Sequence, residues 1–567
     1  MNTKSCFFRL TTSFASLILT VVFSVQLSFG SDRSEFMPEQ YNFFFRVSSF
    51  TDFLEAISKL PISGIFHGAE VRSFVESFDE DKIVQSIEAT RLLIQRSKFF
   101  KGETLFAMAG AEHKMFYLMA ELKSGEHAEL LESLTKIITL TPVGISWSNE
   151  TASDMELIKI ELTGKSALWL AFCNDTLVLS GDRDWVIQSF IRLIKSEITM
   201  HDSVPVLDVK ISVQYALEEC QKRLRQCAML GLCPKDMDLK KLAVGMGLDT
   251  SGDCAFRLQI GENRVEMCSS LYTGSEFKFK QGLVADINRK LPFVPTDIYA
   301  VTFCAFDLYS CWSDFPEMLE MMNREMAMAF MIAKTLVSGM TLQDPGVDFF
   351  AHMDTQFASF TQVAENKTKL LSYWELKNQG EFAASINKLF SKDGILRNGF
   401  GFEIDESEIQ GFKVYSTRSG GLCGLDSFSL TVAGGNMIMG NSDLVRSALE
   451  NLAGGKEESL LLLPATTTKF PQGIIAQKPS VISCVDWKSF CSIFFSDNVK
   501  KQLSAFFSNI DFENMAVETT GFYSEEVIEF IKKIDVEKFF SLLFNTFCYS
   551  VETDDSMEWH AVMDWSE

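Results

Sequence analysis

Residues 177–186 read LVLSGDRDWV, and residues 437–445 read MIMGNSDLV. In both segments an apolar run ends at a glycine, and an aspartate follows three residues later. The apolar run is typical of a strand, and the aspartate favours a helix N-terminus, where the helix dipole stabilises negative charge. The two segments therefore predict the same strand–turn–helix unit twice, with Gly181 opposite Gly440 at an offset of 259 residues.

Three further matches keep the same order along the chain, at offsets between 254 and 273 residues. They pair Pro38 with Pro295, Glu121 with Glu375, and Asp238 with Asp511. Self-similarity in a fixed order is the signature of an internal repeat. The sequence therefore predicts a duplicated chain whose halves have diverged.

Each half reads as strands that alternate with helices. A hairpin is expected from residues 166–172 and 177–179 around Asn174, and a meander from 242–248, 254–260 and 265–271. Strands joined by short turns pair antiparallel, which indicates an α+β fold rather than a doubly wound one. We expect two diverged copies of a mixed, mainly antiparallel sheet-plus-helices unit in tandem.

The N-terminus has the layout of an export signal. Lys4 and Arg9 precede Phe14–Phe29, which contains no charge, and the small residues Ser28 and Gly30 suit cleavage after position 30. The uncharged run of 16 residues is short for a membrane span, which needs about 20. An uncleaved anchor is the alternative. We expect an exported protein, periplasmic or extracellular.

The domain organisation follows from the signal and the repeat. We predict a signal peptide over 1–30, a first α+β unit over 31–280 and a second over 281–567. The most apolar later segment, Met326–Val337, has 12 residues and contains Lys334. It is too short to cross a bilayer, so no span is expected in the mature chain.

Composition excludes some partners. The formal charge of −23 repels phosphate backbones and anionic lipid, so nucleic-acid binding is not expected. The chain has 51 Phe but only 10 Tyr and 8 Trp. Phe has no polar group, so these side chains are expected in the core or in an apolar binding surface.

Thirteen cysteines, one of them in the signal, leave an even number in an exported chain. Cys304 and Cys311, and likewise Cys484 and Cys491, are seven positions apart where a strand pattern changes to a helix pattern. Both pairs are candidate disulfides, because a strand-to-helix corner can bring their Cα atoms within bonding range. The alternative is that they are buried apolar residues.

Metal and cofactor signals are weak. The third cysteine group, Cys220, Cys227 and Cys233, lacks the CxxC spacing typical of zinc sites. The acidic segment that includes Glu558 and His560 lacks an EF-hand pattern and is expected to be solvated surface. No cofactor and no metal site are predicted.

One methionine-rich segment stands out. Six methionines crowd residues 318–331, where we expect core packing, with an adaptable apolar groove or a Cu(I) site as alternatives. Their positions are Met318, Met321, Met322, Met326, Met328 and Met331.

The export signal, the tandem halves and the glycine–aspartate motif together resemble families of uncharacterised exported bacterial proteins that carry a domain of unknown function. The resemblance covers most of the mature chain. It implies a periplasmic or surface location, and it transfers no functional residue.

Motifs of several enzyme classes are absent from the sequence. There is no GxSxG elbow, no phosphate-binding GxxxxGK[ST] loop and no HExxH pair, and the six histidines are scattered. No catalytic residue is assigned. We expect a non-enzymatic protein that binds an apolar ligand, an envelope component or a protein partner through Phe/Met-rich surfaces. The alternative is a cell-envelope hydrolase with a carboxylate-based site.

Overall fold

The computed structural model describes residues from Met37 to Asp564, with gaps. The predicted signal peptide and Cys491 lie outside the described residues. Short gaps of one to five residues occur throughout. The longer gaps are 61–99, 133–144, 196–205, 230–236, 275–282, 418–427, 460–476 and 487–544.

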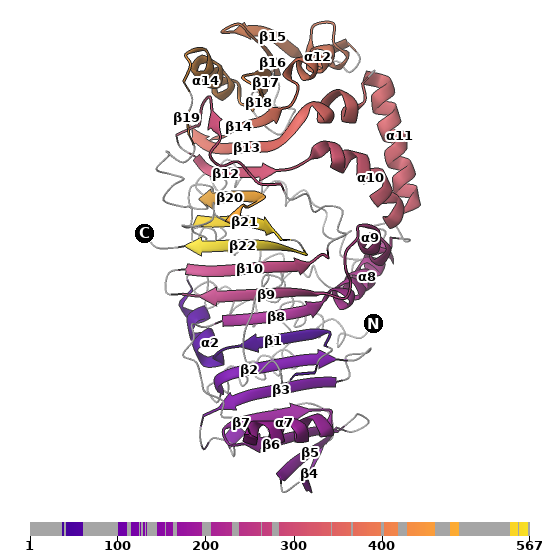
Figure 1. The fold of residues 1–567 in the computed structure, drawn as a ribbon, viewed down its shortest axis with the longest axis vertical. Coiled ribbons are helices and arrows are strands. Elements are labelled where there is room, and N and C mark those ends of the chain that lie inside the picture. Colours follow the sequence, from indigo (N-terminus) through magenta and orange to yellow (C-terminus); the bar gives the residue numbers. More distant parts are fainter. Residues whose placement is uncertain are drawn as a thin grey trace, which may run out of the picture.

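Twenty of the described strands form one continuous sheet, in which every strand pairing is antiparallel (Figure 1). The lower part in Figure 1 comprises, in spatial order, β4 (Ile145–Ala152), β5 (Met155–Leu162), β6 (Leu168–Cys173), β7 (Thr176–Ser180), β3 (Met115–Leu122), β2 (Phe100–Ala109), β1 (Phe43–Val47), β8 (Val206–Ser212), β9 (Asp253–Ile260) and β10 (Arg264–Tyr272).

The upper part continues from β10 to the other end of the sheet. It comprises β22 (Ser556–Asp564), β21 (Asn545–Glu552), β20 (Val481–Asp486), β12 (Ile298–Ala305), β13 (Met353–Ala364), β14 (Lys367–Leu376), β18 (Asn436–Gly440), β17 (Phe428–Ala433), β16 (Phe412–Thr417) and β15 (Ile404–Ile409). A separate two-stranded sheet joins β11 (Lys290–Leu291) to β19 (Glu458–Ser459).

The β10–β22 pair joins the two parts. Its register runs from Arg264 opposite Asp564 to Tyr272 opposite Ser556, and Cys268 stands opposite His560 in the middle. Both strands also pair on their other side, β10 with β9 and β22 with β21. Neither strand is therefore an edge of the sheet.

The strand order is the same on both sides of this pair. Residues that stand directly opposite one another on successive strands form a ladder across the sheet. On one side, this ladder runs from Phe44 of β1 through Lys210 and Ala255 to Ser270 of β10. On the other side, it runs from Val301 of β12 through Cys484 and Phe547 to Val562 of β22. Ser270 and Val562 thus take equivalent places, and so do Cys268 and His560. The central pair is made of two equivalent residues.

The same correspondence holds further out. Glu121 pairs with Thr176 on one side, and Glu375 pairs with Asn436 on the other. Ser180 is opposite Tyr117, and Gly440 is opposite Leu371. Tyr117 and Leu371 each lie four residues before the matched glutamates, so Ser180, rather than Gly181, takes the position of Gly440. The predicted counterpart is therefore displaced by one residue.

The predicted fold class is wrong in its architecture. We expected two α+β units in tandem, whereas twenty of the described strands belong to one sheet and only β11 and β19 pair separately. The reason lies in β10 and β22, whose backbone N–H and C=O groups would be exposed at the edge of any separate unit. Their mutual pairing satisfies these groups and fuses the sheet. The domain boundary at residue 280 stays a prediction.

Two local predictions have different outcomes. The hairpin around Asn174 is confirmed as β6–β7, and Asn174 has the positive φ, 51°, that a tight hairpin turn requires. Of the meander, β9 and β10 are confirmed, but residues 239–245 form helix α9 (Leu239–Gly245). Asp238 starts this helix, because its carboxylate accepts hydrogen bonds from the backbone N–H groups of Lys240 and Lys241.

Helices cover parts of both faces of the sheet. On one face, α7 (Arg183–Lys195) and α14 (Ser442–Ala453) bury Val186 and Val445 against the strands. On the other, α2 (Phe50–Lys59) and α12 (Gln379–Phe390) bury Phe53 and Phe382. We call these the α7/α14 face and the α2/α12 face.

Four helices lie together beside the sheet, at the right of Figure 1. They are α8 (Val213–Met229), α9, α10 (Leu308–Met322) and α11 (Arg324–Thr341). Helix α9 packs closely on α10, since a Cβ at Gly245 would overlap the side chain of Met321. Helix α11 is the outermost of the four (Figure 1).

Short helical turns complete the description. A π-helical turn over Pro345–Phe349 and a 3-10 turn over Phe350–His352 lead from α11 to β13. Helix α13 (Ile395–Asn398) follows α12.

Gly440 offers a test of the β14–β18 junction. It has φ +152°, and a Cβ there would lie 2.0 Å from the carbonyl oxygen of Leu370. We expect Gly440→Ala to lower the free energy of unfolding by about 3 kcal/mol or more, because strain and overlap add. Urea denaturation of the mature protein measures this.

Gly435→Ala is the matched control. Gly435 has φ +75° but no neighbouring atom within 4 Å of a Cβ, so only the backbone strain of about 1–2 kcal/mol is expected. Equal effects of the two substitutions would contradict the close approach at Gly440.

Candidate functional site

A row of charged side chains crosses the middle of the α7/α14 face. Arg46, Asp208 and Arg257 stand directly opposite one another on β1, β8 and β9. The Asp208 carboxylate accepts from both arginines, at 3.0 Å from Arg46 Nη1 and 2.8 Å from Arg257 Nε. Arg46 also pairs with Glu103 of β2. We call these four residues the charged row.

The charged row is shielded from water. The side chain of Asp208 is 7% exposed, and those of Arg46 and Glu103 are 16% and 13% exposed. Charges at such depth are tolerated only when paired and hydrogen-bonded, and here each carboxylate faces a guanidinium. The row alternates in sign and is neutral as a whole.

The other side of the sheet replaces this row with apolar and aromatic residues. By the ladder correspondence, Phe303, Ile482 and Tyr549 stand where Arg46, Asp208 and Arg257 stand. Phe303 and Ile482 belong to the main hydrophobic core. The charged row is thus a feature of one side only, and it ends at the central strand pair.

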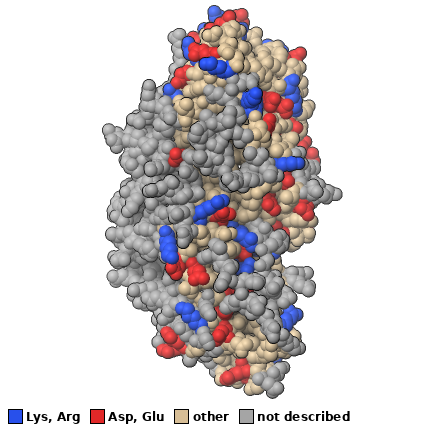
Figure 2. All heavy atoms as spheres, turned by 60° about the vertical axis from the view of Figure 1, so that its left-hand side comes forward, with Lys and Arg blue, Asp and Glu red and all other residues tan. Residues whose placement is uncertain are grey.

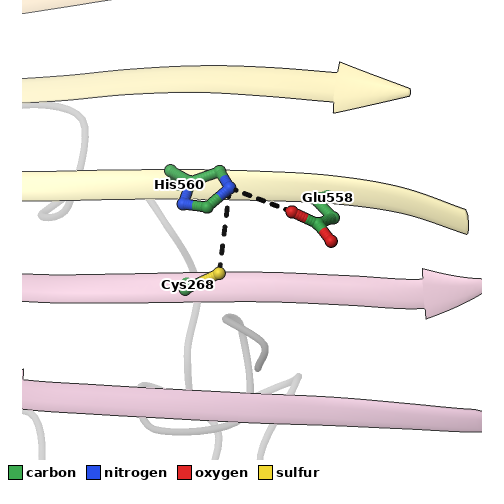
Figure 3. Close-up of side chains that lie close together, drawn as sticks. All are labelled: Cys268, Glu558 and His560. Carbon is green, nitrogen blue, oxygen red and sulfur yellow. Dashed lines mark hydrogen bonds and ion pairs between the residues drawn. The ribbon is translucent and has the colours of Figure 1, made fainter. Parts of the chain in front are cut away.

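At that central pair, three potential ligand side chains converge (Figure 3). Cys268 of β10 faces His560 of β22 across the ladder, with 3.8 Å between Sγ and Nε2. Glu558 lies two residues before His560 and so on the same face, with 3.4 Å between its Oε2 and the same Nε2. We call Cys268, Glu558 and His560 the central triad.

Aromatic stacking fixes the imidazole. The Tyr549 ring lies parallel to the His560 ring, with centroids 4.4 Å apart and planes 4° from parallel. Tyr549 is opposite His560 on β21, so its position comes from the strand ladder. The ring nitrogen Nε2 is held toward Cys268 and Glu558 (Figure 3).

The environment keeps the Cys268 thiol protonated. Burial, with a smaller contribution from the negative charge of Glu558, raises the pKa of Cys268 to about 12. Thiolate, not thiol, is the nucleophile of cysteine enzymes, and their cysteines have lowered pKa values. Cys268 therefore lacks the ionisation of a catalytic nucleophile in the metal-free protein.

The geometry also distinguishes a catalytic triad from a set of metal ligands. A Cys–His–Glu catalytic triad needs the cysteine and the carboxylate on opposite ring nitrogens, so that one orients the ring and the other gives up a proton. Here both face Nε2. Among the described residues, this is the group of Cys, His and acidic side chains whose ligand atoms all lie within 4.8 Å of one another.

A second candidate site is the outer surface of α11. Large apolar side chains lie exposed on it, including Ile332 and Leu336 at 58% each and Met328 at 56%. Met331, Val337 and Met340 are also exposed. Phe330 instead packs on Trp312 of α10, with ring centroids 5.4 Å apart. We call the six exposed residues between Met328 and Met340 the α11 apolar surface.

Three polar side chains of α11, those of Lys334, Thr335 and Thr341, interact with groups inside the protein. Lys334, the one charged residue between 328 and 340, places its ammonium over the Trp312 ring and 3.9 Å from Asp344. Thr335 donates its hydroxyl to the Met331 carbonyl, and Thr341 to that of Val337. The exposed surface along residues 328–340 is consequently apolar apart from Thr335, and it has no outward charge.

The methionine-rich segment thus differs from the expectation of core packing. It divides into two helices at Asn323, which caps α11 through a hydrogen bond from the backbone N–H of Met326 to its side chain. Met328 and Met331 are exposed, at 56% and 45%. The core interpretation is wrong for these two residues, because α11 contacts the rest of the protein along one stripe only.

The cysteines proposed as disulfides occupy the expected kinds of element where they are described. Cys304 lies near the end of β12 and Cys311 in the first turns of α10, while Cys484 lies on β20. Cys484 is opposite Val301, and Cys304 is opposite Val481. Both predicted bridges stay predictions.

Sequence reasoning missed the charged row and Cys268. A signal for the row exists, since Arg46, Asp208 and Arg257 each interrupt an apolar strand. Cys268 and His560 are far apart in the chain, and no local pattern relates them. Glu558 and His560 were interpreted as solvated surface, whereas both are partly buried, at 34% and 21% side-chain exposure.

Comparisons with known proteins add little. No protein-family model and no curated protein matches the chain. Two solved crystal forms of TP0453, III and I, are similar at 10% identity each, with TM-scores of 0.26 and 0.23. They cover 43% of this chain and 81% and 80% of the other. Such low TM-scores carry no argument, and the resemblance to uncharacterised exported proteins stays a prediction.

Removal of the shared carboxylate tests the charged row. Asp208→Ala leaves Arg46 and Arg257 without their common partner, which we expect to lower the free energy of unfolding by about 3–5 kcal/mol. Urea denaturation measures the change. Glu161→Ala, which breaks a more exposed pair with Lys159, is the control and should change stability little. Similar losses in both variants would contradict the shielded row.

Alkylation tests the environment of Cys268. In folded protein treated with EDTA, we expect iodoacetamide at about pH 8 to modify Cys268 far more slowly than the exposed Cys220 of α8. The rate at Cys268 should still increase with pH above about pH 9, where an ordinary thiol is already mostly ionised. Peptide mass spectrometry follows both sites, and equal rates at about pH 8 would refute the raised pKa.

Proposed function

We propose that this exported protein binds an apolar envelope component, the surface of a lipid membrane, through the α11 apolar surface, without catalysing a reaction. The observation that carries the proposal is an outward-facing helix of 18 residues whose exposed side chains between 328 and 340, apart from Thr335, are apolar. Large apolar surfaces of this kind are costly in water and are characteristic of interaction sites.

The dimensions and composition of α11 favour lipid. No single described helix is long and apolar enough to cross a membrane. The bent pair of Arg324–Thr341 and Pro345–His352 together has the length and apolar composition of a membrane span. A helix of this kind can lie in the interfacial plane of a bilayer with its apolar side chains among the acyl chains. The internally bonded Thr335 and Thr341 hydroxyls add little desolvation cost there.

The charge of the protein determines the kind of membrane binding. With a formal charge of −23, the protein is repelled by anionic headgroups. Figure 2 shows described acidic and basic side chains intermingled over the face it presents, rather than a patch of one sign. Because the exposed surface of α11 has no outward charge along residues 328–340, the proposed contact is hydrophobic, and its strength should depend little on salt.

The hydrolase alternative receives less support. A carboxylate-based site needs two acids that converge on a substrate, one of them protonated near neutral pH. The shielded carboxylates of Glu103 and Asp208 instead accept hydrogen bonds from Arg46. Pairing with guanidinium groups occupies the oxygens of these carboxylates, which leaves them poorly placed to act on a substrate.

Vesicle flotation tests the proposal. We expect the mature protein to float with zwitterionic phosphatidylcholine vesicles at both low and high salt. The double variant Ile332→Asp/Leu336→Asp should partition roughly 30-fold less per substituted side chain, since each removes about 2 kcal/mol of apolar burial. Ile194→Asp is the matched control, because Ile194 is 63% exposed on α7, away from α11, and should leave flotation unchanged.

Two outcomes would contradict lipid binding through α11. One is flotation of the double variant at the level of the wild type. The other is a wild-type dimer in light scattering that the double variant dissociates, with no flotation of either, which would assign α11 to self-association.

A further inference from the structure

We propose that the central triad is a zinc site, in which Cys268 Sγ, His560 Nε2 and Glu558 Oε2 bind one Zn²⁺ between β10 and β22. The proposal concerns the centre of the sheet and does not depend on lipid binding by α11. Thiolate, imidazole and carboxylate are the three ligand types that zinc uses in proteins, and three protein ligands leave one coordination position for water or another ligand.

The distances fit a tetrahedral ion. Zinc bonds of about 2.3 Å to sulfur and about 2.0–2.2 Å to nitrogen or oxygen separate neighbouring ligand atoms by roughly 3.3–3.6 Å. The structure has 3.4 Å between Nε2 and Oε2 and 3.8 Å between Sγ and Nε2. All three atoms lie within 4.8 Å of one another, so small side-chain rotations complete the site.

The strand ladder preorganises the ligands. Glu558 and His560 alternate by two along β22, which places both side chains on one face. Cys268 is directly opposite His560 on the neighbouring strand. The Tyr549 ring stacks on the imidazole and restricts its orientation. Figure 3 shows Nε2 directed at the other two ligands. Backbone pairing thus places all three ligands before an ion arrives.

The local charge suits a divalent cation. Glu558 contributes a carboxylate, and the carboxylate of Glu266, which is paired with Arg264 at 2.7 Å, acts on Cys268 from β10. The opposing cation is Arg257, which faces Cys268 in the ladder, but its guanidinium is bonded to Asp208 at 2.8 Å. Pairing with Asp208 therefore offsets part of the positive charge of Arg257, which still acts on Cys268.

The ligand set selects among metals. Ca²⁺ and Mg²⁺ prefer six or more oxygen ligands, which a single carboxylate does not supply. A thiolate with an imidazole favours zinc or cobalt of similar geometry. Because its ligands come from both central strands, the ion would tie β10 to β22 across the ladder.

The test uses full-length mature protein stripped with EDTA and then desalted. Zn²⁺ is titrated in competition with a chromophoric chelator, and Co²⁺ is added separately as a spectroscopic probe. We expect one Zn²⁺ per chain, and a thiolate-to-cobalt charge-transfer band with the strong visible absorption of tetrahedral Co²⁺.

Variants assign the signal to the triad. Cys268→Ser and His560→Gln should each abolish the tetrahedral Co²⁺ spectrum and weaken Zn²⁺ binding by at least about tenfold. Cys548→Ser is the matched control, because Cys548 lies on the adjacent strand β21 and faces the opposite side of the sheet from Tyr549. It should retain both the spectrum and the affinity, and circular dichroism checks that every variant is folded.

Three results would overturn the proposal. The first is stripped wild-type protein that gives no thiolate-to-cobalt band. The second is a band that survives in folded Cys268→Ser. The third is a band lost in Cys548→Ser and kept in His560→Gln, which would place the ion elsewhere. The first of these does not require any variant to fold.

Discussion

The antiparallel pairing of β10 with β22 is the contact on which the rest of the architecture depends. It joins two sets of strands of the same order into one 20-stranded sheet and removes two edges that would otherwise expose unpaired backbone groups. The pairing also brings Cys268 beside His560, from positions far apart in the chain. Helix α9 then lies against α10 at the side of the sheet, where α11 extends outward (Figure 1).

The two sides of this pair have adapted the same ladder differently. Apolar and aromatic side chains, such as Phe303 and Ile482, fill the α7/α14 face beyond β22. The equivalent positions before β10 carry Arg46 and Asp208, whose burial is made tolerable by alternating ion pairs. The central triad lies where the charged and apolar stretches meet. A zinc site there would have ionic neighbours on one side and the stacked ring of Tyr549 on the other.

Local patterns in the sequence predicted local structure well. The hairpin at Asn174 and the helices after Gly181 and Gly440 follow from turn chemistry and from acidic residues at helix N-termini. The predicted strand over 242–248 was wrong, because its apolar residues suit a strand but the cap at Asp238 starts a helix over Leu239–Gly245. Edge-to-edge pairing of β10 with β22 leaves no local signal, so neither the single sheet nor the central triad could be anticipated. The exposure of α11 was equally hidden, since a buried and an exposed apolar helix read alike.

Hydrogen–deuterium exchange of the mature protein tests the central claim of one continuous sheet most directly. We expect the amides of β10 and β22 to be protected as strongly as those of their outer neighbours β9 and β21, because all four strands are internal. Rapid exchange confined to β10 and β22, at the rate of an exposed edge strand, would contradict the account and indicate two separate sheets.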